Sequence, residues 1–365
     1  MLRSFEGARG AEALRKRQAG DVELVALTTA VPANTINQDE VRDEAAPYLA
    51  GMEHMLSTFG NAGVHHRHMV KPVSWYLESH DWVERTAVFQ EAALELLVQA
   101  TESCLAEARM APSEIDAVVL VTSTGISIPS LDAALANHLG FKSSVERTPI
   151  FGLGCAGGAT GLARAAQLVE ANPDFVVLLL VVEICSANLS LLNVSKTDAV
   201  AFTLFGDGAS AVLLRRGGSR KPAHIARYVT SGEHLWPDTG NLAGITVRKD
   251  SLGLRLSPAL VAFVRKNLGP AVDLFLRNRD LALDDFTGFV FHAGASKMIE
   301  AAAEALGVDM DSFESSSAVL RDYGNLSACS VLFVLERALR TGATGRHLMG
   351  ALGPGFTLSL VVLDL

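Results

Sequence analysis

The chain has 365 residues, of which 49% are apolar and 19% charged, and its formal net charge is −9 at pH 7. This composition supplies a large core and excludes an intrinsically disordered chain. The net negative charge argues against general nucleic-acid binding, which needs a basic face. At this length we expect two domains or one large duplicated domain.

Several features indicate where the protein works. The longest apolar run covers residues 175–182 and is too short to span a membrane. The first twenty residues lack an apolar core followed by a cleavage site, so we expect no signal peptide. The four cysteines are not spaced like a disulfide framework or a zinc site. We therefore expect a cytoplasmic protein without a metal or stable membrane insertion.

Strands and helices alternate along the chain. In chain order, the apolar patterns predict a strand at 22–27, a helix at 83–108, a strand at 117–122, a helix at 159–170, and strands at 175–183 and 204–215. After the polar segment 217–222 they predict a helix at 256–278, a strand at 286–292, helices at 297–306 and 326–339, and two strands around Gly353. Apolar strands separated by helices predict an α/β fold with mixed, largely parallel sheets covered on both faces.

One constant shift along the chain relates its two parts. It places residue 117 on 288, Gly154 on Asn325, and 175 on 346, so that strand, helix start and strand coincide. A duplicated α/β unit explains this match. We therefore expect a mobile tail at residues 1–20, an N-terminal half at 21–218 and a C-terminal half at 219–365.

Cys155 is the first candidate for chemistry. It lies in Gly-Leu-Gly-Cys-Ala-Gly-Gly at 152–158, where the glycines permit a tight turn and leave room for a ligand beside the sulfur. The helix that follows would favour a thiolate at its N-terminus. A lone cysteine is more often a buried core residue, but this surrounding sequence favours a nucleophile.

His292 and Asn325 complete the candidate set. His292 ends a predicted strand, where ligand groups gather in open α/β sheets. His65, His66 and His68 fit no convincing zinc site and read as surface or tunnel-mouth residues. Asn325 precedes a helix and would ordinarily be an N-cap, but the repeat places it opposite Cys155. An imidazolium could hold the thiolate, and the imidazole and amide N–H groups could stabilise an oxyanion. A papain-like peptidase would use these three residue types differently.

Five segments together resemble the type III polyketide synthases, the chalcone and stilbene synthase superfamily of thiolase-like enzymes. They are Thr-Ser-Thr-Gly-Ile-Ser-Ile-Pro at 122–129, Gly-Leu-Gly-Cys-Ala-Gly-Gly at 152–158, Leu-Phe-Gly-Asp-Gly at 204–208, Tyr-Gly-Asn-Leu-Ser at 323–327 and Gly-Pro-Gly-Phe at 353–356. The resemblance covers nearly all of the chain after the tail. Residues 55–76 look most like bacterial alkylpyrone and alkylresorcinol synthases. The resemblance implies a five-layered αβαβα fold with two pseudo-symmetric halves, a homodimer, and acyl-CoA and malonyl-CoA substrates with no further cofactor.

The resemblance also implies residue roles. Cys155 would accept the acyl group, and His292 and Asn325 would support malonyl-CoA decarboxylation. Phe205 resembles a gatekeeper between coenzyme A tunnel and cavity, although a core phenylalanine explains it equally well. Ile128 would reach towards the partner's cavity. The other expected substrate-binding positions are Ser123, Cys185, Asn188, Leu256, Ser327, Lys297 and Gly353.

Some positions depart from the family. The loop after the histidine reads Ala293-Gly294-Ala295 instead of Pro-Gly-Gly. Leu256 stands where the family has a second gatekeeper phenylalanine and would widen the cavity. Lys297 is a candidate substitute for the basic residues that grip coenzyme A phosphates. Cys185 and Asn188 at the plant pocket threonines argue against an aromatic starter.

The expected function is therefore a type III polyketide synthase that extends a fatty acyl starter and closes an alkylpyrone or alkylresorcinol ring. Two alternatives remain open at this point. One is a ketoacyl synthase III-like enzyme that uses acyl carrier protein, and the other is a catalytically degenerate acyl-binding paralogue.

Overall fold

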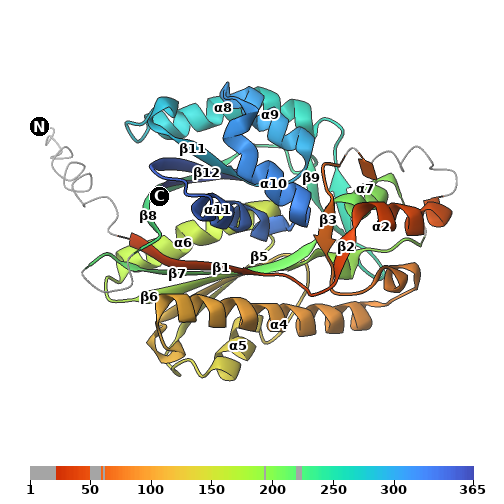
Figure 1. Ribbon diagram of the computed structural model, residues 1–365, viewed down its shortest axis with the longest axis horizontal. Helices are drawn as coiled ribbons and strands as arrows, with labels where there is room; N and C mark the ends of the chain where they lie inside the picture. The colour runs from red at the N-terminus through yellow and green to blue at the C-terminus, as the bar shows by residue number, and fades with distance from the viewer. Residues whose placement is uncertain (1–21, 50–58, 61, 193–194, 219–223) are drawn as a thin grey trace, which may run out of the picture.

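The computed structural model describes residues 22–49, 59–60, 62–192, 195–218 and 224–365. Within them, helices and strands stack in five alternating layers (Figure 1). The expected mobile tail at 1–20 lies outside the described residues, as does most of the segment 217–222. The division into halves at 218 and 219 therefore stays a prediction.

The two β layers join into one nine-stranded sheet with the order β11-β12-β13-β8-β1-β7-β6-β4-β5. Parallel pairs join β4 to β5, β4 to β6, and β11 to β12, and the other five pairs are antiparallel. The expected mixed sheet is confirmed, with its parallel pairing confined to the two outer ends. The strands are β1 Val22–Ala30, β4 Ala117–Thr122, β5 Glu146–Phe151, β6 Val176–Ile184, β7 Asp207–Arg216, β8 Ala226–Leu235, β11 Gly288–Phe291, β12 Arg346–Gly353 and β13 Thr357–Asp364.

The strand order repeats in two parts of this sheet. β4-β6-β7-β1 and β11-β12-β13-β8 each show one parallel pair followed by two antiparallel pairs. Among the described strands of this sheet, the two parts pair directly only where Val22–Leu24 of β1 meets β8. A short 3-10 turn leads into a helix at equivalent places, before α6 (Gly157–Ala171) and before α11 (Ser330–Arg340). The expected pseudo-symmetric arrangement of two α/β units is thus confirmed.

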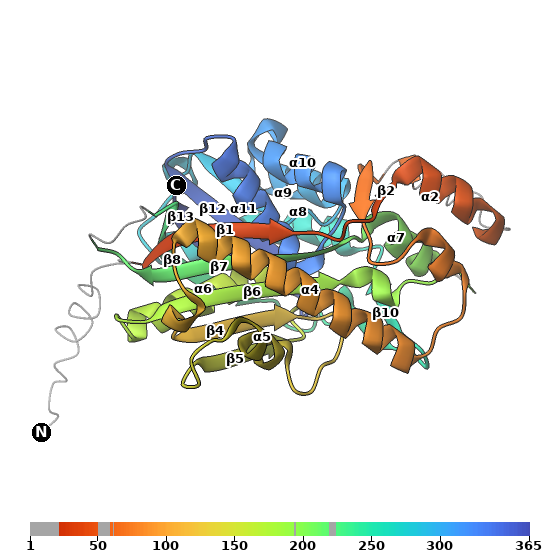
Figure 2. The same cartoon turned by 60° about the horizontal axis from the view of Figure 1, so that its bottom comes forward.

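The helices fill the remaining three layers. α4 (Trp82–Ala108) and α5 (Leu131–Leu139) cover one outer face, and Figure 2 shows α4 lying across β1, β7 and β6. α6 and α11 lie between the two parts of the sheet, where α6 is buried along most of its length. α8 (Leu260–Arg277) and α9 (Ser296–Leu306) cover the other outer face, beside α10 (Glu314–Tyr323). Apolar side chains therefore pack on both faces of the sheet.

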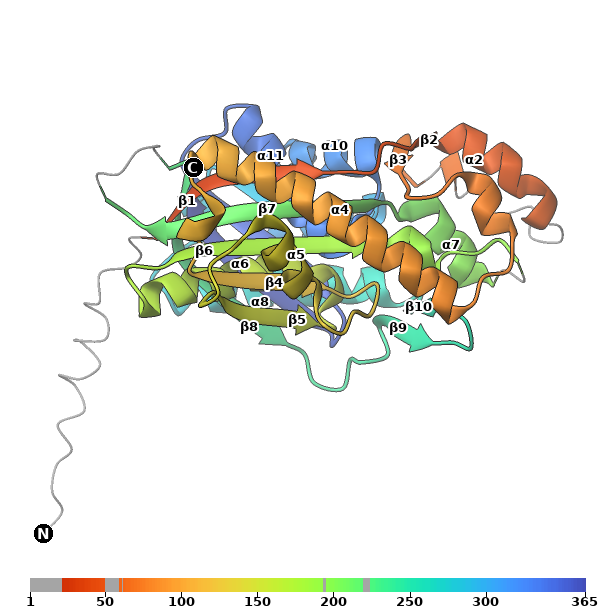
Figure 3. The same cartoon turned by 90° about the horizontal axis from the view of Figure 1, so that it is seen from below.

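Most predicted elements are present with shifted ends, and two need correction. The strand expected at 204–215 begins at Asp207, because Leu204 belongs to helix α7 (Lys196–Leu204) instead. This helix starts at a capping box formed by Ser195 and Asp198. The helix expected at 256–278 begins at Leu260, because Leu256 ends strand β10 (Leu252–Leu256). β10 pairs with β9 (Ala243–Val247) in a hairpin apart from the main sheet (Figure 3).

The remaining elements are short. They are β2 Thr35–Asn37, α2 Gln38–Ala45, β3 His66–His68, and the 3-10 helices Ala46–Leu49, Val73–Leu77, Pro112–Glu114, Gly154–Ala156, Cys185–Asn188, Leu283–Asp285, Met310–Phe313 and Ser327–Cys329.

Candidate active site

Cys155 lies in the 3-10 turn Gly154–Ala156, between β5 and the start of α6. Gly154 has a φ of 51°, and a Cβ there would lie 2.7 Å from Cδ of Pro354. Glycine is therefore required both by the left-handed backbone and by the close approach of the Pro354 loop. The Gly154 N–H donates to Oγ of Ser123 at 3.0 Å, which fixes the turn. The glycines that suggested a nucleophile thus serve to hold the cysteine at this turn.

His292 and Asn325 face the same small space. His292 directly follows β11, and the Asn325 Nδ2 group donates to the Gly294 carbonyl at 3.0 Å. A Cβ built on Gly294 would lie 3.1 Å from Nε2 of His292 and 3.9 Å from Nδ2 of Asn325. Oδ1 of Asn325 accepts from the Ser327 N–H at 2.8 Å, so its amide is held at both ends. The second Nδ2 hydrogen remains available as a donor.

The electrostatics of the pair differ from the sequence expectation. Burial raises the pKa of the Cys155 thiol to about 12 and lowers the pKa of the His292 imidazole to about 4. Nδ1 of His292 is buried with no hydrogen-bond partner among the described residues. Burial therefore favours a neutral thiol and a neutral imidazole over the expected imidazolium and thiolate. A neutral imidazole suits a general base that takes the thiol proton during attack.

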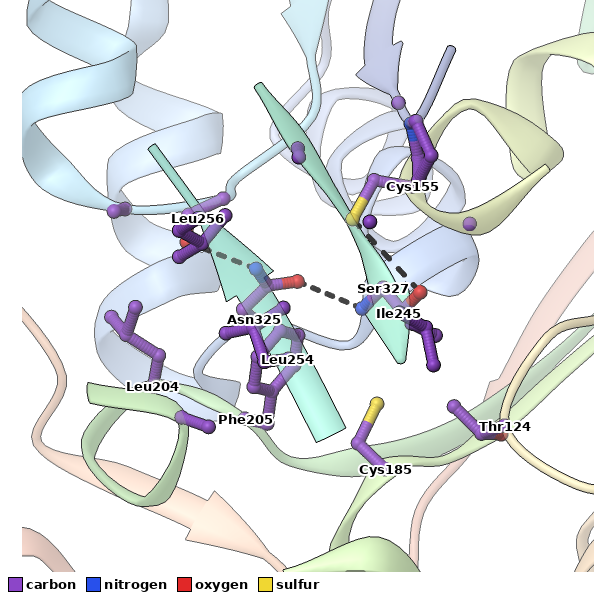
Figure 4. A pocket seen from close by; sticks show the side chains of 18 of the residues that line it. Thr124, Cys155, Cys185, Leu204, Phe205, Ile245, Leu254, Leu256, Asn325 and Ser327 are labelled. Carbon is purple, nitrogen blue, oxygen red and sulfur yellow. Dashed lines mark hydrogen bonds between the residues drawn. The ribbon is translucent and has the colours of Figure 1, made fainter. Parts of the chain in front are cut away.

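A buried carboxyl group adjoins this site and was missed in the sequence. Glu183 accepts from the Ser123 N–H at 3.0 Å, Oγ1 of Thr124 at 2.8 Å and Oγ of Ser327 at 3.3 Å. Sγ of Cys155 lies 3.9 Å from the same Ser327 oxygen (Figure 4). Burial raises the pKa of Glu183 to about 7, so the group can hold or release a proton near neutral pH. The sequence signal was one acidic residue in the apolar strand β6.

A cavity of about 230 Å³ is lined by Cys155, His292 and Asn325. Aliphatic side chains form a large part of its wall, and α7, α9 and the β9–β10 hairpin all contribute to them. Figure 4 shows Leu204, Ile245, Leu254 and Leu256 on this wall. The structure brings together on this wall the three candidate catalytic residues and six of the expected substrate-binding residues, namely Phe205, Cys185, Asn188, Leu256, Ser327 and Gly353.

Three expected substrate-binding residues do not line this cavity. Ser123 is 3% exposed and lies behind the nucleophile turn, where it accepts from Gly154. Lys297 is exposed on α9, and its neighbour Met298 lines the cavity instead, because successive helix residues face different directions. Ile128 is 91% exposed and does not line the cavity of its own subunit. Its expected reach towards the cavity of a partner subunit stays a prediction.

Phe205 occupies the C-cap of α7 and forms a parallel β-bridge with Asn325. A fully buried arginine, Arg67, fixes this end of α7 by donating from Nη1 to the carbonyls of Phe202 at 2.6 Å and Phe205 at 3.0 Å. Of the three clustered histidines, His66 and His68 belong to β3, and His68 stacks on Tyr323. The cluster is thus part of a small strand pair.

Metal and membrane features were also sought among the described residues. There, no group of three or more His, Cys, Asp or Glu side chains is placed to hold a metal ion. Within the same ranges, no helix is long and apolar enough to cross a membrane. All four cysteines are free thiols.

Comparison with known families covers both parts of the chain. Residues 76–218 match the family described as chalcone and stilbene synthases, N-terminal domain. Residues 276–365 match the family described as 3-oxoacyl-[acyl-carrier-protein] synthase III C terminal. The second match is to the class of condensing enzymes considered above as an alternative, so relatives that span nearly the whole chain decide between the two.

Such relatives are type III polyketide synthases. The chain is 34% identical to the 1,3,6,8-tetrahydroxynaphthalene synthase of Streptomyces peucetius, over 93% of this chain and 92% of that protein. It is 26% identical to the alpha-pyrone synthesis polyketide synthase-like Pks18 of Mycobacterium tuberculosis, over 93% and 90%. The solved 1,3,6,8-tetrahydroxynaphthalene synthase of Streptomyces coelicolor, a bacterial type III polyketide synthase, superposes with a TM-score of 0.88 at 27% identity, covering 94% of this chain and 99% of that one.

Enzymes of this family catalyse acyl transfer and condensation, use coenzyme A thioesters as substrates and need no additional cofactor. The expected enzyme class is therefore confirmed. The chain belongs to the chalcone and stilbene synthase family, the type III polyketide synthases.

Proposed function

We propose that this synthase loads a fatty acyl-CoA starter on Cys155, extends it with malonyl-CoA, and closes an alkylpyrone or alkylresorcinol ring. The observation that carries this proposal is the aliphatic wall beside the nucleophile. Leu252, Leu254 and Leu256 of β10 all line the cavity, because alternate strand residues face one side. Ile245 of β9 and Leu204 of α7 line it as well. Each methylene buried against such a wall contributes about 0.8 kcal/mol.

Loading begins with the neutral Cys155 thiol and the neutral His292 imidazole. Nε2 of His292 takes the thiol proton as Sγ of Cys155 attacks the thioester carbonyl of the starter. The carbon–sulfur bond to coenzyme A then breaks, and the imidazole returns the proton to the leaving coenzyme A thiolate. The products are an acyl thioester on Cys155, free coenzyme A and a neutral histidine. The N-terminus of α6 favours the negative charge that develops on the sulfur.

Extension of the acyl chain uses two hydrogen-bond donors, His292 and Asn325. When malonyl-CoA occupies the site, its thioester oxygen accepts hydrogen bonds from Nδ2 of Asn325 and from Nε2 of His292. For this step the neutral imidazole is in the tautomer that carries its single proton on Nε2, whereas in loading the proton is on Nδ1. Loss of carbon dioxide leaves the bonding electrons in an enolate, whose oxygen these donors stabilise. The enolate carbon then attacks the acyl thioester, which forms the carbon–carbon bond and releases the Cys155 thiolate. That thiolate is ready for transfer of the extended chain back from coenzyme A.

The named relatives support this substrate class and leave the product as a proposal. Pks18, named for alpha-pyrone synthesis, supports a pyrone, while the tetrahydroxynaphthalene synthases represent an alternative product. The aliphatic wall favours the alkyl-chain product, because it would bury an alkyl chain along its length. A cytoplasmic location stays a prediction.

We also propose that the enzyme acts as a homodimer. Ile126, Ile128 and Phe151 are 52%, 91% and 62% exposed. They lie at or just beyond the ends of the adjacent parallel strands β4 and β5. Exposed apolar side chains after neighbouring strand ends favour a protein interface. Light scattering should show a dimer that Ile128→Glu weakens, and a wild-type monomer would contradict the proposal.

The test of the proposed function is product mass spectrometry. The protein is incubated with malonyl-CoA and short, long or aromatic acyl-CoA starters, with Cys155→Ala as the blank. Alkylpyrones or alkylresorcinols from long-chain starters, absent in the blank, are expected. A tetrahydroxynaphthalene product formed in place of alkyl products would overturn the starter proposal. Condensation only with malonyl carrier protein would instead support the carrier-protein alternative.

A further inference from the structure

The cavity has an end remote from the catalytic residues. At the near end, the Asn325 N–H donates to the Leu204 carbonyl at the last residue of α7. Asp198 lies seven residues before Phe205, which is about 10 Å farther along the helix axis at 1.5 Å per residue. Both Asp198 and the near-end residues line the cavity. The cavity therefore extends along α7 away from Cys155.

The β9–β10 hairpin forms the opposite wall. The base of the hairpin is near the catalytic turn. There the Ser257 N–H donates to the Leu242 carbonyl, and the Phe356 N–H donates to Oγ1 of Thr239, a few residues before β9. Its tip carries Arg248, directly after β9, and Ser251, directly before β10. Leu256 and Leu252 are roughly 13 Å apart along the strand at about 3.3 Å per residue.

An ion pair joins these two walls at the far end. Nη2 of Arg248 lies 2.8 Å from Oδ1 of Asp198, and their side chains are 38% and 17% exposed. Among the described residues, these are the only Asp, Glu, Lys or Arg that line the cavity. One side of the pair therefore faces an aliphatic space while the other reaches solvent.

Both partners are held in place by further contacts. A Cβ on Gly253 would lie 2.1 Å from Nε of Arg248, so the arginine lies across a strand position that has no side chain. The Arg248 carbonyl accepts from Nε1 of Trp82 at 3.1 Å. Oδ2 of Asp198 accepts from Oγ of Ser195 at 2.6 Å in the capping box. Burial alone would raise the pKa of Asp198, but the hydrogen bonds from Arg248 and Ser195 outweigh it and lower the pKa. This pair differs from a typical mobile surface ion pair.

We propose that the Arg248–Asp198 ion pair closes the distal end of the cavity and sets the longest acyl chain that Cys155 can carry. The inference rests on the proposed acyl-starter function. A chain that reaches the pair must stop there or strip water from two charges, which is unfavourable without compensation. Arg248 thus acts as a specificity-determining residue at a distance from the reacting atoms.

A competition assay tests this inference directly. Pairs of saturated acyl-CoA starters that differ in length are mixed with the enzyme without malonyl-CoA, and intact-protein mass spectrometry gives the ratio of acyl-enzymes. Arg248→Ala is the test variant and Arg248→Met keeps bulk without charge. Arg255→Ala is the matched control, because Arg255 lies on the same hairpin, does not line the cavity and donates to the Gly240 carbonyl at 2.9 Å.

Arg248→Ala should favour starters beyond the wild-type limit by roughly tenfold for two added methylenes. Arg248→Met should shift the limit in the same direction by less, and decides the matter if the alanine variant is unstable. Unchanged ratios in both variants, or an equal shift in Arg255→Ala, would overturn the inference. A wild-type enzyme that loads no acyl chain would instead refute the proposed function, so the two failures are distinct.

Discussion

Phe205 and Asn325 are joined through their backbones. The Gly206 N–H donates to the Asn325 carbonyl at 3.1 Å, and the Asn325 N–H donates to the Leu204 carbonyl at 2.7 Å. The end of α7 in the predicted N-terminal half is thereby fixed to the segment that opens α11 in the C-terminal half. Both side chains line the cavity, so the acyl-binding wall and the proposed oxyanion donor share one rigid support.

The amide donor of Asn325 can be removed while its acceptor is kept. Asn325→Asp retains an oxygen for the Ser327 N–H but loses Nδ2, which now donates to Gly294. We expect malonyl-CoA decarboxylation, measured as carbon dioxide release, to fall by about 10²–10³ in kcat. Cys155→Ala serves as the control, since it leaves both donors in place. An unchanged rate in Asn325→Asp would show that the amide does not stabilise the enolate.

Gly294 offers a second way to disturb the same space. An alanine Cβ there would lie 3.1 Å from Nε2 of His292, a tight contact in the place where a substrate oxygen must bind. Gly294→Ala should therefore lower kcat at least tenfold, while the melting temperature changes little. Steady-state kinetics and thermal unfolding on the same sample separate these effects. Wild-type kinetics would mean that the oxyanion binds elsewhere.

Glu183 predicts a particular pH dependence of stability. Burial raises its pKa from the ordinary 4.5 to about 7, so the folded protein holds a proton that the unfolded chain has released between these values. Its contribution to stability is fully present below pH 4.5 and is lost as the pH rises through 7. Glu183→Gln should remove this term, which amounts to about 3 kcal/mol. Denaturant unfolding of both proteins from pH 4 to 8 measures it, and a pH-independent difference in unfolding free energy would contradict the assignment.

The sequence reveals some parts of this molecule better than others. The strand at 117–122 was predicted with its observed ends, because an apolar run buried on both faces is unambiguous. Cys155 was identified because a cysteine surrounded by so many glycines is unusual. Lys297, by contrast, was placed in the site by residue type alone, and the direction it faces on α9 depends on packing.

Tertiary contacts explain most of what was missed. The β9–β10 hairpin is short and half-exposed, so its pattern of leucines up to Leu256 resembled the start of a helix. Glu183 looked like the polar end of a strand, and its three hydrogen-bond partners come from distant segments. The pairing of Arg248 with Asp198 was not predicted, because it forms only where α7 and the β9–β10 hairpin meet at the cavity.

Leu256 should control the width of the acyl cavity. Its side chain lines the wall among the leucines of β10. Leu256→Phe adds volume within a confined space, so we expect relative kcat/KM for the longest accepted starter to fall roughly tenfold, while a short starter is unaffected. Product yields with paired starters measure this ratio. An equal loss with short and long starters would indicate general damage instead of a narrower cavity.

The central claim is that Cys155 carries the growing acyl chain. Enzyme is mixed with a long-chain acyl-CoA in the absence of malonyl-CoA, digested, and examined by peptide mass spectrometry while released coenzyme A is quantified. The account predicts one acyl group per active site, on the peptide that contains Cys155, with an equal amount of coenzyme A released and none with Cys155→Ala. Acylation of Cys104, Cys185 or Cys329 instead, or coenzyme A release that persists in Cys155→Ala, would contradict it.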